Sequence, residues 1–102
     1  MGIPNKRETE FAKTFFKHDN YWYHPPFFDL DGYRKYFPDF YDAERDCYIE
    51  VAGTRQAWHQ RKKAFLLAMR KYPDIKFEVR TVRGDLVPIK AKRISWNGAD
   101  GL

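Results

Sequence analysis

The sequence predicts one small α/β domain in which two helices flank a mixed β-sheet. Residues 55–71 have apolar side chains at helical spacing, and residues 75–80 alternate strictly between apolar and charged. Several short, aromatic-rich segments upstream have the composition of strands. The resulting order of helix, three or four strands, helix and strand is typical of α/β sandwiches. With 102 residues, we expect a single domain over residues 1–102, with its core at about residues 6–80.

The N-terminal half is expected to contain one helix followed by short strands. Residues 6–17 place Phe11, Ala12, Phe15 and Phe16 on one helical face. A Pro-Pro and an Asp-Gly dipeptide separate the apolar segments that follow, and both favour turns. The expected strands cover residues 21–24, 27–30, 35–41 and 46–52, with a loop at 42–45.

The C-terminal half contains the clearest helix, at residues 55–71. Thr54 is placed to cap its N-terminus, and Trp58, Phe65 and Met69 form its main apolar stripe. A Pro-Asp dipeptide ends the helix. Beyond it we expect a strand at residues 75–80, a shorter strand at 87–94 and a loose tail at 95–102.

The composition favours a polyanionic partner. Lys and Arg number 19 against 14 acids, which gives a net charge of +5 and makes nucleic acid the leading partner class. Cys47 is the only cysteine, so no disulfide forms within the chain, which suits a reducing cytoplasm. No apolar run approaches the roughly 20 residues of a membrane span. The sequence also lacks a Gly-rich phosphate loop, and its three histidines show no zinc-site spacing. We therefore expect a soluble cytoplasmic protein that binds no membrane.

Asp39 and Glu50 form the most informative pair of residues. They lie on neighbouring expected strands, and strand alternation directs Glu50 away from the apolar side chains of Cys47, Ile49 and Val51. We expect the apolar side chains to face the core and Glu50 to face a cleft. Two carboxylates on adjacent strands can share a Mg²⁺ ion, which favours oxygen ligands. The alternative is that they are two separate surface acids.

Residues 36–41, Tyr-Phe-Pro-Asp-Phe-Tyr, followed by Tyr-Ile-Glu-Val at 48–51, resemble the motif of the PD-(D/E)XK nuclease superfamily. The pattern is most similar to small phage-borne endonucleases and to the endonuclease subunit of Tn7-type transposition. The resemblance implies a restriction-endonuclease-like αβββαβ core with a mixed sheet flanked by two helices. It also implies Mg²⁺-dependent DNA hydrolysis, with Mn²⁺ as a substitute. The protein would then come from a phage or mobile element and act in the bacterial host cytoplasm.

Such nucleases often take a third acid from the first helix, and Glu8 is the better of two candidates. At 100° per residue, Glu8 falls at about 60°, in the middle of the apolar face, whereas Glu10 falls near −100° on the solvent side. An acid on an apolar face needs a partner, such as a metal. The alternative is that Glu8 is exposed in the first turn and favoured by the helix dipole.

The lysine of the family motif is missing, because position 52 is Ala. Two residues are candidates to replace it: Gln56, whose amide can hold a water, and Lys62. Lys62 falls at about 40° from Trp58, within the stripe that packs on the sheet. It either reaches the carboxylates or extends to solvent. In the superfamily this lysine is known to migrate onto the helix.

The sequence therefore predicts a DNA endonuclease with catalytic Asp39, Glu50, Lys62 and Gln56 and a metal held by Asp39, Glu50 and Glu8. Arg55, Arg61 and Lys63 on the basic helix are expected to contact the DNA backbone. Cutting two strands with one site per chain favours a homodimer, and a partner protein that supplies specificity is the alternative. Two other functions stay open: a catalytically inactive DNA-binding protein of nuclease fold, and a basic interaction domain.

Overall fold

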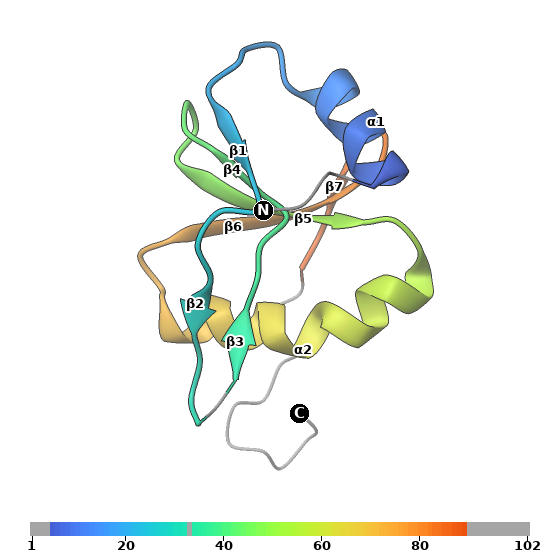
Figure 1. Cartoon of the computed structure of the whole chain (residues 1–102). Helices are drawn as coiled ribbons and strands as arrows, with labels where there is room; N and C mark the ends of the chain where they lie inside the picture. Colours follow the sequence, from blue (N-terminus) through green and yellow to red (C-terminus); the bar gives the residue numbers. More distant parts are fainter. Residues whose placement is uncertain (1–4, 33, 90–102) are drawn as a thin grey trace.

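The computed structural model describes residues 5–32 and 34–89. They form a five-stranded mixed sheet with helix α1 (Lys6–Phe15) on one face and helix α2 (Arg55–Lys71) on the other (Figure 1). The predicted α/β class with a mixed sheet and two helices is confirmed. The strands are β1 (Tyr21–Tyr23), β2 (Phe28–Asp29), β3 (Lys35–Tyr36), β4 (Phe40–Asp42), β5 (Cys47–Ala52), β6 (Lys76–Thr81) and β7 (Leu86–Val87).

The sheet follows chain order, β1-β4-β5-β6-β7. Strands β1, β4 and β5 form an antiparallel meander, in which Phe40 pairs with both Tyr23 and Ile49. Helix α2 then crosses over to β6, which runs parallel to β5, and β7 returns antiparallel. A parallel pair needs such a crossover, and a helix is its usual form. In the part of the chain that the structure describes, neither helix is long and apolar enough to cross a membrane.

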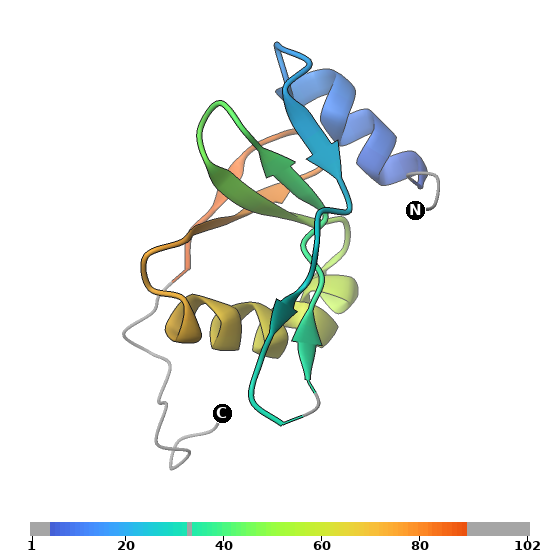
Figure 2. The ribbon, with the colours of Figure 1, turned by 60° about the vertical axis from the view of Figure 1, so that its left-hand side comes forward.

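The strand expected at residues 35–41 is instead two strands, and this prediction was wrong. Residues 35–36 form β3, which pairs with β2 in a hairpin beside α2, apart from the main sheet (Figure 2). Residues 40–42 form β4 within the main sheet. Pro38 lies at the break, and proline has no N–H to donate to a sheet ladder. Asp39 consequently lies just before β4, where its N–H donates to the Ile49 carbonyl at 3.1 Å.

Both faces of β5 are covered, so the cleft expected at Glu50 is a small cavity that Glu8 and Asp39 also line. Cys47 and Ile49 pack against Phe11 on the α1 side. Tyr48, on the opposite face, packs with Phe77 on the α2 side. Because each face of the sheet has its own helix, Glu50 is buried beneath α2, with 1% of its surface exposed.

The remaining predicted elements differ only at their ends. Helix α1 ends at Phe15 because Phe16 adopts an extended backbone, with φ −79° and ψ 128°, and its ring enters the core. The helix at 55–71 and the N-cap at Thr54 are confirmed. Strand β7 is Leu86–Val87, so it overlaps the strand expected at residues 87–94 only at Val87, and residues 88–89 are not in a strand. Residues 90–94 of that strand and the predicted tail at 95–102 lie outside the described residues.

A network of charged side chains links neighbouring strands of the sheet at the end of β4 farther from Pro38. Arg45 donates to both carboxylate oxygens of Glu78, at 3.0 and 2.7 Å, and to Asp42 at 3.0 Å. Arg80 also donates to Glu78 at 3.0 Å. Burial acts to raise the pKa of Glu78, but the hydrogen bonds from both arginines outweigh it and hold that pKa at about 2. The network therefore ties the β4–β5 turn to β6.

Candidate metal centre

Three acidic side chains from different elements are buried in one region. Glu8 comes from α1, Asp39 from the segment before β4, and Glu50 from β5. Their exposed fractions are 8%, 4% and 1%. All three line a cavity of about 120 Å³ together with Arg61 and residues around Gly53. Acids are almost never buried this deeply unless they are paired or bind a metal.

Backbone contacts fix Asp39 and Glu8. One oxygen of Asp39 accepts from the Val51 N–H at 2.8 Å, so the carboxyl group lies against β5. Glu8 is the third residue of α1, and it completes a capping box with Asn5. It also interacts with the Tyr23 hydroxyl through a hydrogen bond. Glu8 therefore has a structural role at the helix N-terminus as well as a place in the cavity.

Arg61 and Tyr36 hold Glu50. Arg61 Nε lies 2.7 Å from one carboxylate oxygen and Nη2 lies 3.0 Å from the other, which is a bidentate pair. The Tyr36 hydroxyl donates to Glu50 at 2.8 Å. Arg61 also donates to the Phe37 carbonyl and lies 4.0 Å from the nearer oxygen of Asp39. One cation from α2 thus faces two acids of the cavity.

The electrostatics of the region leave a proton on the acids when no cation is added. Burial, and after it the charge of Glu50, raise the pKa of Asp39 to about 8, although Arg61 and the Val51 N–H oppose the shift. Burial also raises the pKa of Glu50, against the opposing effects of Arg61 and the Tyr36 hydrogen bond. It costs free energy to ionise both buried acids together. A divalent cation would displace the proton and balance their negative charges.

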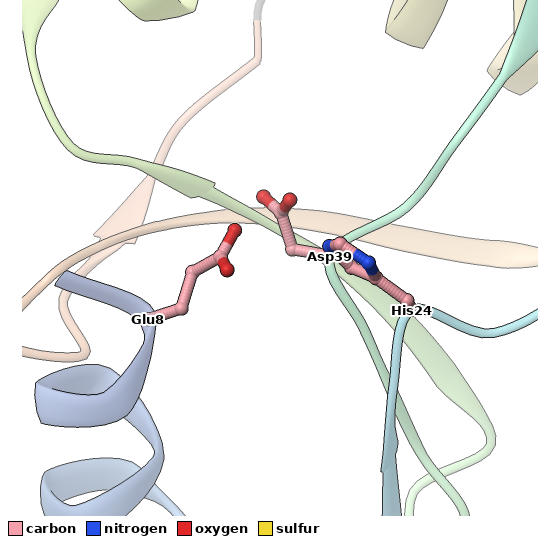
Figure 3. A group of neighbouring side chains, drawn as sticks. All are labelled: Glu8, His24 and Asp39. Carbon is pink, nitrogen blue, oxygen red and sulfur yellow. The ribbon is translucent and has the colours of Figure 1, made fainter. Parts of the chain in front are cut away.

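His24 joins Glu8 and Asp39 in a group that the sequence did not predict (Figure 3). One ligand atom from each of the three side chains lies within 4.8 Å of the other two. The group depends on strand pairing, because Tyr23 is opposite Phe40. This register brings the next residues, His24 and Asp39, together, and the His24 N–H donates to the Asp39 carbonyl at 2.9 Å. No spacing rule within the sequence identifies such a group, because its members are separated by unrelated distances along the chain.

The structure brings together some of the predicted site residues and separates others. Glu8 is buried and Glu10 is exposed, as the helical-face argument predicted. Lys62 is exposed, and the residue that reaches the carboxylates is its neighbour Arg61. Arg61 lies about −60° from Trp58 and Lys62 about 40°, so each flanks the apolar stripe, and only the −60° flank faces the acids.

The other predicted residues on α2 are exposed. Gln56 lies away from the cavity, whose lining includes Ala57 instead. Arg55 and Lys63 are also exposed, and their contact with DNA stays a prediction. Arg61, which was predicted with them as a DNA contact, is mainly a partner of Glu50. For Lys62, the structure agrees with the alternative that its side chain extends to solvent and does not reach the carboxylates.

A second, wider hollow of about 510 Å³ adjoins the cavity and shares Asp39 and Arg61 with it. Phe27 and Phe37 lie along it, with ring centroids 5.5 Å apart and about half of each residue exposed. The acids thus have an open, partly aromatic approach. Chemically, the region offers three carboxylates, one imidazole and the guanidinium groups of Arg7 and Arg61. Comparisons of the chain with models of protein families, with curated proteins and with solved structures found no match.

Proposed function

We propose that the chain is a metal-dependent DNA endonuclease of the PD-(D/E)XK type. The observation that carries the proposal is the convergence of Glu8, Asp39 and Glu50 on one small cavity beside a cation. The proposal is also supported by the order α1, β1, β4, β5, α2 and β6, since the motif implies an αβββαβ core; the β2–β3 hairpin is inserted between β1 and β4. The net charge of +5 favours a polyanionic substrate.

Asp39 and Glu8 would hold the divalent ion, and Glu50, whose carboxylate is held by Arg61 and Tyr36, would add negative charge to the same cavity. A bound Mg²⁺ or Mn²⁺ would lower the pKa of an attacking water and would stabilise negative charge on the phosphate. The cavity is small enough to hold an ion and a few waters, and the adjoining hollow leaves room for a phosphodiester beside Asp39. Hydrolysis then adds water across one P–O bond of the DNA backbone, leaving a phosphate and a hydroxyl end.

Arg61 is the best replacement for the missing lysine. It lies beside both Glu50 and Asp39, where a positive charge can bind a phosphate oxygen. Its guanidinium can exchange one Glu50 contact for a phosphate contact, since its donors are arranged for either group. This assignment takes the role that Lys62 was expected to have, because Lys62 is exposed.

Cleavage of supercoiled plasmid tests the proposal. Wild-type protein should nick or linearise DNA with Mg²⁺ or Mn²⁺, and EDTA should stop it. Asp39→Asn and Glu8→Gln should each reduce the rate by on the order of 100-fold, since each loses a charged ligand of the ion. Glu10→Gln is the matched control, because Glu10 is on the same helix but exposed. Equal rates for Asp39→Asn and the wild type would contradict the proposed site.

A DNA-binding protein without catalysis is the second candidate. It is favoured by Ala52 at the motif lysine position and by the ion pair that Arg61 makes with Glu50. This candidate predicts retardation of DNA on a gel in EDTA, no cleavage with any divalent ion, and binding unchanged by Asp39→Asn. The plasmid assay and the gel therefore separate the two functions.

A further inference from the structure

The group of Glu8, His24 and Asp39 has a composition that matters for the choice of metal. It combines two carboxylates with one imidazole, and its ligand atoms lie within 4.8 Å of one another. Ligands bound to one ion at about 2.1 Å each lie at most about 4.2 Å apart. Small side-chain rotations are therefore enough to bring all three onto one ion. Glu50 is not in this group and is held by Arg61 and Tyr36.

His24 is held in place by its surroundings. Its backbone has φ 54°, in the left-handed region that few non-glycine residues adopt, and its N–H donates to the Asp39 carbonyl at 2.9 Å. Its ring stacks on the Tyr23 ring, with centroids 3.7 Å apart and an interplanar angle of 21°. Tyr23 also forms the hydrogen bond with Glu8. Tyr23 thus contacts two of the three proposed ligands, and residues behind metal ligands commonly orient them in this way.

The group is also open on one side. His24 is exposed, whereas Glu8 and Asp39 are buried, and the wide hollow that adjoins the cavity is lined by both His24 and Asp39. Three protein ligands with open positions are typical of catalytic rather than structural metal sites. Water and a phosphate oxygen can take the open positions from the side of the hollow.

We propose that Glu8, His24 and Asp39 form one metal site that prefers a first-row transition ion, such as Mn²⁺, to Mg²⁺, and that His24 is the ligand that sets this preference. Mg²⁺ favours oxygen ligands and retains its waters, whereas imidazole suits transition ions. The inference rests on the proposed function only in taking this site as the catalytic one. The binding of the ion is independent of DNA cleavage.

Titration of the EDTA-treated full chain with Mn²⁺ and with Mg²⁺, by calorimetry and without DNA, tests the inference. Wild-type protein should bind one Mn²⁺ on the order of tenfold or more tightly than Mg²⁺. The informative variant is His24→Asn, because asparagine tolerates the left-handed backbone but lacks the imidazole. It should weaken Mn²⁺ binding by about tenfold or more and leave Mg²⁺ binding nearly unchanged, so the preference is lost.

Two variants control the measurement. His59→Asn replaces an exposed histidine on α2 and should leave both affinities unchanged. Glu8→Gln should weaken binding of both ions, since it removes a charge that both use. Circular dichroism of each variant verifies the fold before titration.

The outcomes separate this inference from the proposed nuclease. Equal affinity of the wild type for Mn²⁺ and Mg²⁺, an unchanged preference in His24→Asn, or no binding of either ion would overturn the metal assignment. The plasmid assay decides the nuclease separately. Mn²⁺ binding that depends on His24, with no cleavage of DNA, would retain the metal site and reject the nuclease. Cleavage that requires Asp39, together with equal Mn²⁺ affinity of the wild type and His24→Asn, would retain the nuclease and reject the role of His24.

Discussion

Replacing Arg61 by Met should destabilise the fold, because it leaves Glu50 buried without its counter-ion. Glu50 is 1% exposed and accepts two charged hydrogen bonds from Arg61, at 2.7 and 3.0 Å. Breaking one side of a buried ion pair typically costs about 3–5 kcal/mol. The Arg61 side chain is 40% exposed, so solvent screens part of the pair, and the Tyr36 hydrogen bond remains. We expect a loss of about 2–4 kcal/mol near pH 8, a large share of the roughly 5–15 kcal/mol stability of a small domain.

Urea unfolding followed by tryptophan fluorescence measures this loss, and a double-mutant cycle assigns its cause. In a Glu50→Gln background, Arg61→Met should cost less than about 1 kcal/mol, because a neutral amide needs no counter-ion. The cost in the wild-type background should also shrink toward pH 5. The pKa of Glu50 is raised by burial, and removing Arg61 raises it further, so the acid becomes neutral at a higher pH.

Lys62→Met provides the matched control, since Lys62 is the exposed neighbour of Arg61 on the same helix. It should change stability by less than about 0.5 kcal/mol. If Arg61→Met costs the same with and without the Glu50 carboxylate, or no more than Lys62→Met, the assignment of Arg61 as the counter-ion of the buried acids is wrong.

Two further predictions concern pH. In metal-free protein, Asp39 has a folded pKa of about 8, above its ordinary 3.8, so it lowers stability as pH rises from about 4 to 8. Asp39→Asn should therefore be more stable than wild type by about 1–3 kcal/mol at pH 8 and nearly equal to it at pH 4, as thermal melts in EDTA would show; a constant difference would contradict this. The pKa shift of Glu78 has the opposite sign, because its folded pKa is held at about 2, below its ordinary 4.5. Its contribution to the free energy of unfolding is therefore present above pH 4.5 and is lost as the pH falls toward 2. Glu78→Gln should cost about 2 kcal/mol in urea unfolding at pH 7 and much less at pH 2.5, with Asp74→Asn, exposed in the turn before β6, as the unaffected control.

Patterns that depend on near neighbours in the chain were predictable from the sequence. The helix at residues 55–71 follows from apolar spacing and the Thr54 cap, and both are confirmed. The burial of Glu8 follows from its position on the apolar face of the first helix. The proximity of Asp39 to β5 follows from the order of two adjacent segments, although Asp39 lies just before β4 and not within the strand expected to carry it.

Contacts between distant segments were decided only by the tertiary structure. A helical wheel places Arg61 and Lys62 on opposite flanks of one stripe, and only the docking of α2 on the sheet determines which flank meets the acids. His24 reaches Asp39 because β1 pairs with β4 in a particular register. The residues around Pro38 leave one sheet and enter another, which local alternation does not reveal. Local patterns in the sequence were enough to predict helices, turns and apolar faces, because these depend on residues close together in the chain. The register of strands and the docking of helices depend on the packing of the whole chain, so the charges that meet are known only from the folded structure.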